Sequence, residues 1–314
     1  MNKIELPSMD FPRAQVSSIN CFLDEELLNK WQQNADQKAF LPKVRDTFGK
    51  IIFPKGKDYP YCFASIALSM DGKMAYPDNQ DGDMLVHSNS LNKDGALADF
   101  FILNFLRAYS DAVLVGTKTM KAEANAFVTI HDMELVAERK IQMPDKTEQP
   151  FTIVSSKDGT DIPYEHILFH QDLIPVVVFT SPVGFENIQK TGAAGFYLLS
   201  DVTKTNIYKN IGKTAIVVTG KGDEPDIKSF LSKMKLGGVD HILIESPTVM
   251  WLLMKERLMN EFLITYTSIF VGGQFSPGFF SAFTFDEHPE SRIVSLNHHQ
   301  NTFLFSRQLI EEEK

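Results

Sequence analysis

Residues 61–73 read Tyr-Cys-Phe-Ala-Ser-Ile-Ala-Leu-Ser-Met-Asp-Gly-Lys, and this stretch decides the fold. The part from Cys62 to Leu68 is almost continuously apolar, which predicts a strand buried on both faces, as in a parallel sheet. A polar turn follows it directly. A long apolar helix is expected over Leu91–Tyr109, and a second apolar run, Ala112–Val115, leads into Gly116 and a hydroxyl-rich helix start. This order is typical of α/β proteins that build their sites at the ends of strands.

Composition limits the classes of function. The chain has 314 residues, of which 43% are hydrophobic and 23% charged, and this suits one or two globular domains. A formal net charge of −9 argues against a nucleic-acid partner. Two cysteines, Cys21 and Cys62, indicate a reducing compartment without disulfides. We find no signal-peptide pattern and no membrane-spanning run, so we expect a cytoplasmic protein without a membrane partner.

The chain divides near residue 58. Residues 1–58 read as an N-terminal extension with a helix around Leu23, Leu27 and Trp31, and they offer no recognisable chemistry. Residues 59–314 read as the main domain. Further strands are expected at 151–154, 175–180, 195–199, 214–219 and 241–245, with helices at 185–190, 226–235 and 248–257. This alternation predicts a mostly parallel sheet. The last strands, 261–271, 291–296 and 302–308, lack helices between them and are expected to be antiparallel at one edge.

Three positions at strand ends are candidates for a site. Gly116 would let a ligand approach the backbone beside a helix N-terminus that binds phosphate, although an ordinary strand-to-helix turn reads the same way. Lys73 lies just past the first buried strand, where it is either a catalytic group or a solvated loop lysine. Glu245 ends another strand, and it suits a site as well as a favourable contact with the next helix dipole.

Several common sites are absent from the sequence. His298 and His299 are adjacent, so their rings point to opposite faces of a strand, and neither a His-x-x-x-His pair nor paired cysteines occur. We therefore expect no metal site. Neither a Gly-x-Gly-x-x-Gly fingerprint, nor a Walker loop, nor a Gly-x-Ser-x-Gly elbow is present.

Taken together, four segments resemble a known family. They are Ala-Leu-Ser-Met-Asp-Gly-Lys at 67–73, Leu-Arg-Ala at 106–108 with the run 111–119, Ile-Leu-Ile-Glu at 242–245, and the stretch 258–273 that ends in Gly-Gly. The chain resembles the reductase domain of riboflavin biosynthesis, which is the C-terminal domain of bifunctional deaminase/reductase proteins. The resemblance implies a dihydrofolate-reductase-like α/β fold, with a mixed, mostly parallel sheet flanked by helices. It also implies a homodimer that uses NADPH to reduce a small molecule.

The resemblance assigns roles to individual residues. It places the catalytic residues Lys73 and Glu245 near the substrate ribose, where hydride arrives. It gives the substrate-binding positions as Ser88, Arg107, Glu123 and Phe127, with Arg107 near a phosphate. It gives the cofactor-binding positions as Gly116, Thr119 and Ser246.

The sequence departs from the family at two places. The family's Asp-Asp-Pro motif lacks its proline at 123–127, and Ile130 stands where an arginine is expected to anchor phosphate. The family's Glu-Gly-Gly-Gly reads Glu245-Ser246-Pro247-Thr248, and Pro247 has no N–H to donate. We expect an NADPH-dependent reductase resembling 5-amino-6-(5-phosphoribosylamino)uracil reductase. The alternatives are a reductase of the same fold with another substrate, and a non-catalytic ligand-binding protein on this scaffold.

Overall fold

One sheet runs through the molecule. The structure is a computed structural model that describes residues 4–34, 40–79 and 83–311, and these form an eleven-stranded sheet of order β1-β10-β11-β9-β2-β8-β3-β4-β5-β7-β6. The strands are β1 (Ile19–Leu23), β2 (Tyr61–Ser69), β3 (Ala112–Gly116), β4 (Phe151–Ser155), β5 (Val176–Thr180), β6 (Phe196–Leu198), β7 (Thr214–Val218), β8 (His241–Ile244), β9 (Glu261–Thr267), β10 (Ser291–His299) and β11 (Phe303–Ile310).

The strands from β9 to β6 in this order are mutually parallel. The apolar runs of β3, β4, β5, β7 and β8 are buried on both faces, as the continuous pattern predicts. The expected mixed, mostly parallel sheet is therefore confirmed. One expectation was wrong in part, because β9 pairs in parallel with β2 on one side and antiparallel with β11 only on the other.

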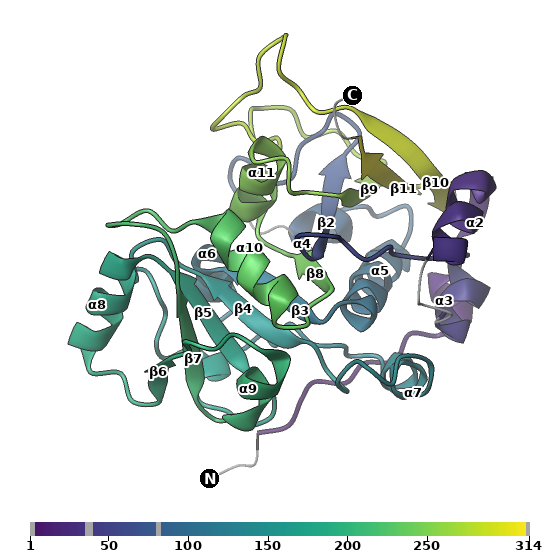
Figure 1. Cartoon of the computed structure of the whole chain (residues 1–314). Coiled ribbons are helices and arrows are strands. Elements are labelled where there is room, and N and C mark those ends of the chain that lie inside the picture. Colours follow the sequence, from purple (N-terminus) through teal and green to yellow (C-terminus); the bar gives the residue numbers. More distant parts are fainter. Residues whose placement is uncertain (1–3, 35–39, 80–82, 312–314) are drawn as a thin grey trace.

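Helices cover both faces of the sheet. They are α1 (Arg13–Val16), α2 (Glu25–Asn34), α3 (Pro42–Thr47), α4 (Asp83–His87), α5 (Gly95–Tyr109), α6 (Thr117–Ala122), α7 (Met133–Gln142), η1 (Ile167–Phe169), α8 (Pro182–Thr191), α9 (Lys204–Lys209), α10 (Ile227–Leu236) and α11 (Pro247–Lys255). One core holds the apolar side chains of α5, α7 and α8, and the other holds those of α9, α10 and α11. Figure 1 shows α10 and α11 in front of the sheet, with α5 beyond it.

The N-terminal extension joins the main sheet. The helix expected there is α2, but a strand was missed, because β1 pairs with β10 and forms one edge of the sheet. Helices α1 and α3 contact the α5 side of the molecule, where Phe11 and Val44 enter the core. The division at residue 58 stays a prediction about domain organisation.

A long segment between β9 and β10 crosses the carboxyl-terminal edge of the sheet. Its first part is held by the carboxylate of Asp71, which accepts hydrogen bonds from the N–H groups of Val271 (3.0 Å) and Gly272 (2.7 Å). Its later part packs on α11, where the indole of Trp251 donates to the carbonyl of Ser281 (2.6 Å). The segment thus bridges the turn after β2 and the helix after β8. Within the described residues, no helix has the length and apolar character needed to cross a membrane.

Candidate active site

An ion pair joins helix α5 to the end of β8. The guanidinium of Arg107 contacts Glu245 with both Nε and Nη2, each 2.8 Å from a carboxylate oxygen, and Nη1 donates to the carbonyl of Thr129 (2.9 Å). The side chains of Arg107 and Glu245 are only 6% and 10% exposed. Two predicted site residues are therefore in direct contact, and each fixes the orientation of the other.

His131 lies next to this pair. Burial lowers the pKa of its imidazole, and the positive charge of Arg107 lowers it further. Its Nε2 is 3.1 Å from the carbonyl of Phe127, and its ring stands edge-on to Phe100. We infer that His131 is neutral at neutral pH, so it adds no cation to this part of the site.

Lys73 lies at the end of a closed turn. The Ser69 hydroxyl accepts a hydrogen bond from the N–H of Lys73 (2.9 Å), and the carbonyl of Lys73 accepts one from the N–H of Ser69 (2.8 Å). The same hydroxyl donates to Asp71 (2.6 Å). This bond and those from Val271 and Gly272 lower the pKa of Asp71 to about 2. The turn is thus held at both ends. Within the described part of the chain, the Lys73 ammonium forms no ion pair.

Lys73 and Glu245 lie on one edge of the sheet, but at different positions along the direction of the strands. Because Ala64 of β2 pairs with Ile244 of β8, Ser65 is level with Glu245. Ser69, to which the Lys73 backbone returns, is four residues further along, or about 13 Å at the rise of a strand. A ligand that touches both groups must therefore lie along the second half of β2. Ser65 and Ala67, which point to the α5 side there, are partly exposed although β2 is an interior strand.

Ser88 follows helix α4 on the exposed side of this path. Its hydroxyl accepts a hydrogen bond from the phenol of Tyr76 (2.7 Å) and donates to the carbonyl of Leu85 (2.9 Å). Tyr76 belongs to the loop that follows Lys73, so the two segments meet here. Ser88 is exposed, and its hydroxyl keeps one lone pair that can accept a hydrogen bond from a ligand, whereas donating to a ligand would require it to give up the bond to Leu85.

Glu123 and Phe127 follow α6 and differ in burial. Glu123 is exposed at the C-cap of α6, whereas the Phe127 ring is 5% exposed and packs in the core on the α5 side. The structure joins Phe127 to the ion pair only through its carbonyl, which contacts His131.

The predicted cofactor positions meet where β3 and β8 end. A Cβ atom placed on Gly116 would lie 2.8 Å from the hydroxyl oxygen of Ser246, so the Ser246 side chain covers this glycine. Ser246 is the N-cap of α11 and Pro247 its first residue, and the Ser246 side chain makes no capping hydrogen bond to the first turn of this helix. The first-turn amides of a helix lack intrahelical partners, so those of Thr248 and Val249 remain for a ligand.

Thr119 lies in α6, partly exposed, two residues into the helix that Gly116 begins. Its neighbour Thr117 donates through its hydroxyl to Asp161, which also accepts from Ser156 at 2.5 Å. Asp161 therefore ties the end of β3 to the loop after β4. The carboxyl ends of these strands form one continuous edge, as parallel pairing requires.

Asp99 is a further candidate for the site, and the sequence analysis did not single it out. It is the only acidic residue in α5, and it is partly buried beside Thr265 of β9, whose hydroxyl hydrogen-bonds to it. Burial raises the pKa of Asp99 to about 6, and Thr265 opposes that rise. Because Thr265 pairs with Ala67, Asp99 lies beside the same second half of β2. A lone carboxylate in an otherwise apolar helix was the available signal.

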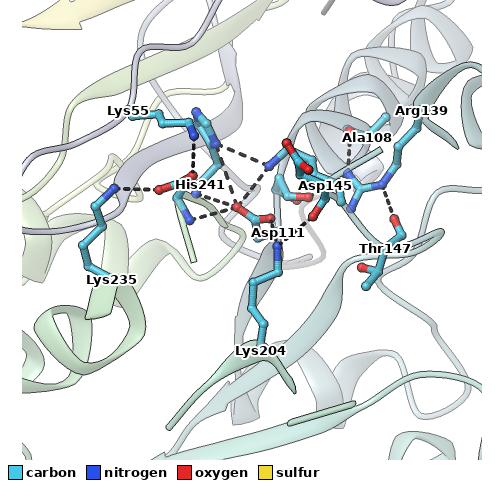
Figure 2. A network of polar contacts seen from close by, with 12 residues as sticks. Lys55, Ala108, Asp111, Arg139, Asp145, Thr147, Lys204, Lys235 and His241 are labelled. Atoms are coloured by element: carbon cyan, nitrogen blue, oxygen red, sulfur yellow. Dashed lines mark hydrogen bonds and ion pairs between the residues drawn. The ribbon is translucent and has the colours of Figure 1, made fainter. Parts of the chain in front are cut away.

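A second polar network lies at the opposite ends of the strands. Figure 2 shows Asp111, which directly precedes β3, at its centre. The Asp111 carboxylate accepts from the ammonium groups of Lys146 (3.0 Å) and Lys204 (2.9 Å) and from the N–H of His241 (3.0 Å). Burial alone would raise its pKa, but the lysines hold it well below the usual range, whereas burial lowers the pKa of Lys146 to about 8. This network is far from the edge that carries the site, and we assign it to stability.

The fold and the edge site define the class of protein. A mostly parallel sheet, helices on both faces and polar residues gathered at the carboxyl ends of β2, β3 and β8 make this a dihydrofolate-reductase-like α/β protein. Within the described residues, no group of three or more histidine, cysteine or carboxylate side chains could hold a metal ion.

Comparison with known proteins gives the family. The sequence profile of the RibD C-terminal domain matches residues 60–305, which is most of the chain. The chain therefore belongs to the RibD C-terminal domain family, and by that membership it is an oxidoreductase. It is 24% identical, over 220 residues, to the 2,5-diamino-6-ribosylamino-4(3H)-pyrimidinone 5′-phosphate reductase of Archaeoglobus fulgidus, and the match covers 69% of this chain and 84% of that protein.

Solved structures support the same fold. A pyrimidine reductase-like protein from Corynebacterium diphtheriae superposes with a TM-score of 0.58 at 17% identity, covering 81% of this chain and 93% of that one. RibD from Acinetobacter baumannii gives a TM-score of 0.55 at 16% identity, covering 92% of this chain and 64% of that one. At these sequence identities the structural similarity establishes the fold, and the nature of the substrate has to be argued from the residues of the site.

Proposed function

We propose that this protein is an NADPH-dependent reductase of a small nitrogen heterocycle, of the class that the name of the archaeal relative describes. One observation carries the proposal. Along the α5 side of β2, the Arg107–Glu245 pair and the turn that carries Lys73 bracket a partly exposed path, and α11 begins beside it with an uncapped first turn. A cation, a fixed carboxylate and free amides are the groups that a reductase of this family would need.

The residues at the ends of β3 and β8 fit a dinucleotide phosphate, with one constraint. The amides of Thr248 and Val249 would hold the phosphate, and the short helix after Gly116 would border it. Because the Ser246 hydroxyl lies where a side chain at position 116 would begin, a phosphate that approaches Gly116 from that side would meet Ser246 first. This makes Ser246 and Thr119 the side chains we expect closest to the cofactor.

The reaction would divide between cofactor and protein. The reduced nicotinamide, when bound, supplies the hydride. Lys73 then donates a proton to the heteroatom on the reacting carbon, since its ammonium has no ion-pair partner among the described residues. Glu245, which accepts hydrogen bonds from Nε and Nη2 of Arg107, would orient the polar groups of the substrate and stabilise positive charge on them. The protein thereby contributes positioning and electrostatics.

Oxidation of NADPH tests the proposal. We would mix the protein with the ribosylaminopyrimidine, either free or as its 5′-phosphate, and follow the absorbance of NADPH. Wild-type protein should oxidise NADPH, and Lys73→Ala should lose about 100-fold or more in kcat, the usual share of a general acid. The control is Lys190→Ala, which removes an exposed lysine from the last turn of α8. No oxidation by wild type, or equal rates for wild type and Lys73→Ala, would refute the proposal.

A second candidate function is ligand binding without catalysis. The covering of Gly116 by Ser246 and the missing N–H of Pro247 favour it, because both restrict the approach of a phosphate to the backbone. Titration with NADPH separates the two functions. Saturable binding supports the reductase, and failure to bind NADPH while a heterocycle binds supports the second candidate.

A further inference from the structure

The Asp71 carboxylate joins the turn that carries Lys73 to the segment that follows β9. We call residues 268–285 of this segment the strap. The strap contains no charged residue, so it can form no ion pair with the turn. Two of its amides, those of Val271 (3.0 Å) and Gly272 (2.7 Å), instead donate hydrogen bonds to the carboxylate of Asp71. Asp71 therefore attaches the strap to the turn.

Main-chain hydrogen bonds align the strap with the turn on both sides of this contact. The N–H of Met70 donates to the carbonyl of Ile269 (2.9 Å), and the N–H of Met74 donates to the carbonyl of Phe275 (2.9 Å). Lys73 lies between the two methionines in the sequence. The position of its backbone therefore depends on how the strap is held.

A second path leads from the same carboxylate to the backbone of Lys73. The Ser69 hydroxyl donates to Asp71 (2.6 Å) and accepts from the N–H of Lys73 (2.9 Å). A hydroxyl has a single proton, so its donation to Asp71 fixes the direction in which it accepts. Hydrogen bonds to Asp71, above all the one from Ser69, lower its pKa to about 2, so Asp71 is itself no proton donor at neutral pH. Any effect of Asp71 on proton transfer would have to pass through Lys73.

The far end of the strap is fixed to α11, which begins two residues after Glu245. The indole of Trp251 donates to the carbonyl of Ser281 (2.6 Å), and the ammonium of Lys255 donates to the carbonyl of Ala282 (2.5 Å). The strap thus connects the helix after Glu245 to the turn of Lys73. Its attachment at Asp71 helps to set how the two predicted catalytic groups lie relative to each other.

We propose that Asp71 is a positioning residue for Lys73, because its carboxylate holds the turn against the strap and thereby places the Lys73 ammonium at the substrate. The inference rests on the proposed function, in which Lys73 donates a proton. A reacting group that is displaced by about 1 Å can lose about 100-fold in rate although the group itself is still present. Loss of the Asp71 carboxylate should therefore lower kcat, and it should do so only where Lys73 is present.

A double-mutant cycle tests the proposal. Asp71→Asn keeps the shape of the side chain but turns one acceptor oxygen into an NH2 group that faces other donors. We expect kcat for NADPH oxidation with the ribosylaminopyrimidine to fall about 10- to 100-fold, with little change in KM for NADPH. In a Lys73→Ala background the same change should cause no further loss, since the group that Asp71 positions is gone.

Two further variants complete the set. Ser69→Ala removes only the hydroxyl between Asp71 and the N–H of Lys73, and it should lower kcat with the same dependence on Lys73. Asp24→Asn is the matched control, because Asp24 is also partly buried and accepts from a main-chain amide, that of Leu27 (3.0 Å), in the N-terminal extension. Asp24→Asn should keep the kcat of wild type. An intact thermal transition shows that each variant is folded.

Hydrogen exchange examines the strap without any substrate. The amides of Val271 and Gly272 should exchange faster in Asp71→Asn than in wild type, because their acceptor is impaired. Unchanged exchange would overturn the proposal. So would an unchanged kcat in both Asp71→Asn and Ser69→Ala, or an equal fold loss with and without Lys73, which would leave Asp71 a structural role alone.

The outcomes separate this inference from the proposed function. If wild type oxidises NADPH and Asp71→Asn does so at the same rate, the reductase assignment holds and the inference fails. If wild type does not oxidise NADPH, the reductase assignment fails, and the positioning role fails with it.

Discussion

At the scale of single residues, the pairing of Arg107 with Glu245 changes what each can do. Either group alone would be an available charge at the edge of the sheet. Together they form a rigid bidentate unit with little exposure to solvent. The unit offers a substrate one oriented carboxylate, and it removes a cation that the family resemblance assigns to phosphate.

The energetic consequence of this pairing can be measured. Arg107→Ala should lower the free energy of unfolding by about 3–5 kcal/mol, because Glu245 would be left buried without its counterion. Removing both partners in Arg107→Ala/Glu245→Ala should cost clearly less than the sum of the single changes. Urea denaturation of the four proteins checks this. Strictly additive losses would mean that the two side chains are not coupled.

Asp99 gives a dependence of stability on pH. Its pKa is raised from 3.8 to about 6 in the folded protein, so the native state binds the proton more tightly than the unfolded chain. The protonated Asp99 carboxyl therefore adds its full contribution to the free energy of unfolding below the pKa of the unfolded chain. This contribution is lost as the pH rises through about 6. Asp99→Asn should be more stable than wild type by about 1–3 kcal/mol near pH 7 and should lose this advantage near pH 4. Thermal melts across this range check it, and a difference that does not vary with pH would contradict it.

At the scale of elements, the first residue of α11 controls the approach of phosphate. Pro247 withholds one of the amides that a helix start offers an anion, so Pro247→Ala should restore a donor. We expect NADPH to bind up to about 10-fold more tightly, the value of a hydrogen bond to a charged group. Pro182→Ala at the start of α8 is the matched control, since Ser181 caps that helix. Unchanged or weaker NADPH binding by folded Pro247→Ala would argue against a phosphate at α11.

The elements show what the sequence could predict. The buried strands β2, β3 and β4 were found within two residues of their ends, because continuous apolar runs leave few alternatives. β1 was missed because its first four residues are exposed, so no burial pattern marks it as a strand. α4 has only five residues, which is too short for a helical period to show.

The candidate site was predictable only in part. Arg107 and Glu245 could each be named, but their ion pair joins residues 138 positions apart and depends on how α5 lies on the sheet. The position of Lys73 well beyond Glu245 along β2 also depends on strand register, which no local pattern fixes. The role of Asp99 follows from burial beside Thr265, and burial is known only when α5 is placed against β9.

At the scale of the whole molecule, the two ends of the parallel strands carry different tasks. The carboxyl ends hold the candidate site. The amino ends hold the Asp111 network, which joins the start of β3 to β8, to the loop before β4 and to α9 (Figure 2). A buried network of this kind fixes several segments to one another and leaves the other edge to vary.

The network should be needed for stability but not for the site. Asp111→Asn should lower the free energy of unfolding by about 3–5 kcal/mol, since Lys146 would lose its buried counterion. Asp240→Asn, whose side chain is 27% exposed and pairs with Lys55 and Lys235, should cost about 1 kcal/mol or less. Urea denaturation compares the two. Equal losses of unfolding free energy in the two variants would show that burial of Asp111 does not make its ion pairs more important for stability.

Transfer of label from cofactor to product tests the central claim most directly. The protein would be given NADPH deuterated at the reactive carbon of the nicotinamide together with the ribosylaminopyrimidine, either free or as its 5′-phosphate, and the product would be examined by mass spectrometry. The account predicts a product that carries the deuterium, formed by wild type and largely lost in Lys73→Ala. Product without the label, or no product from protein that binds both ligands, would contradict it.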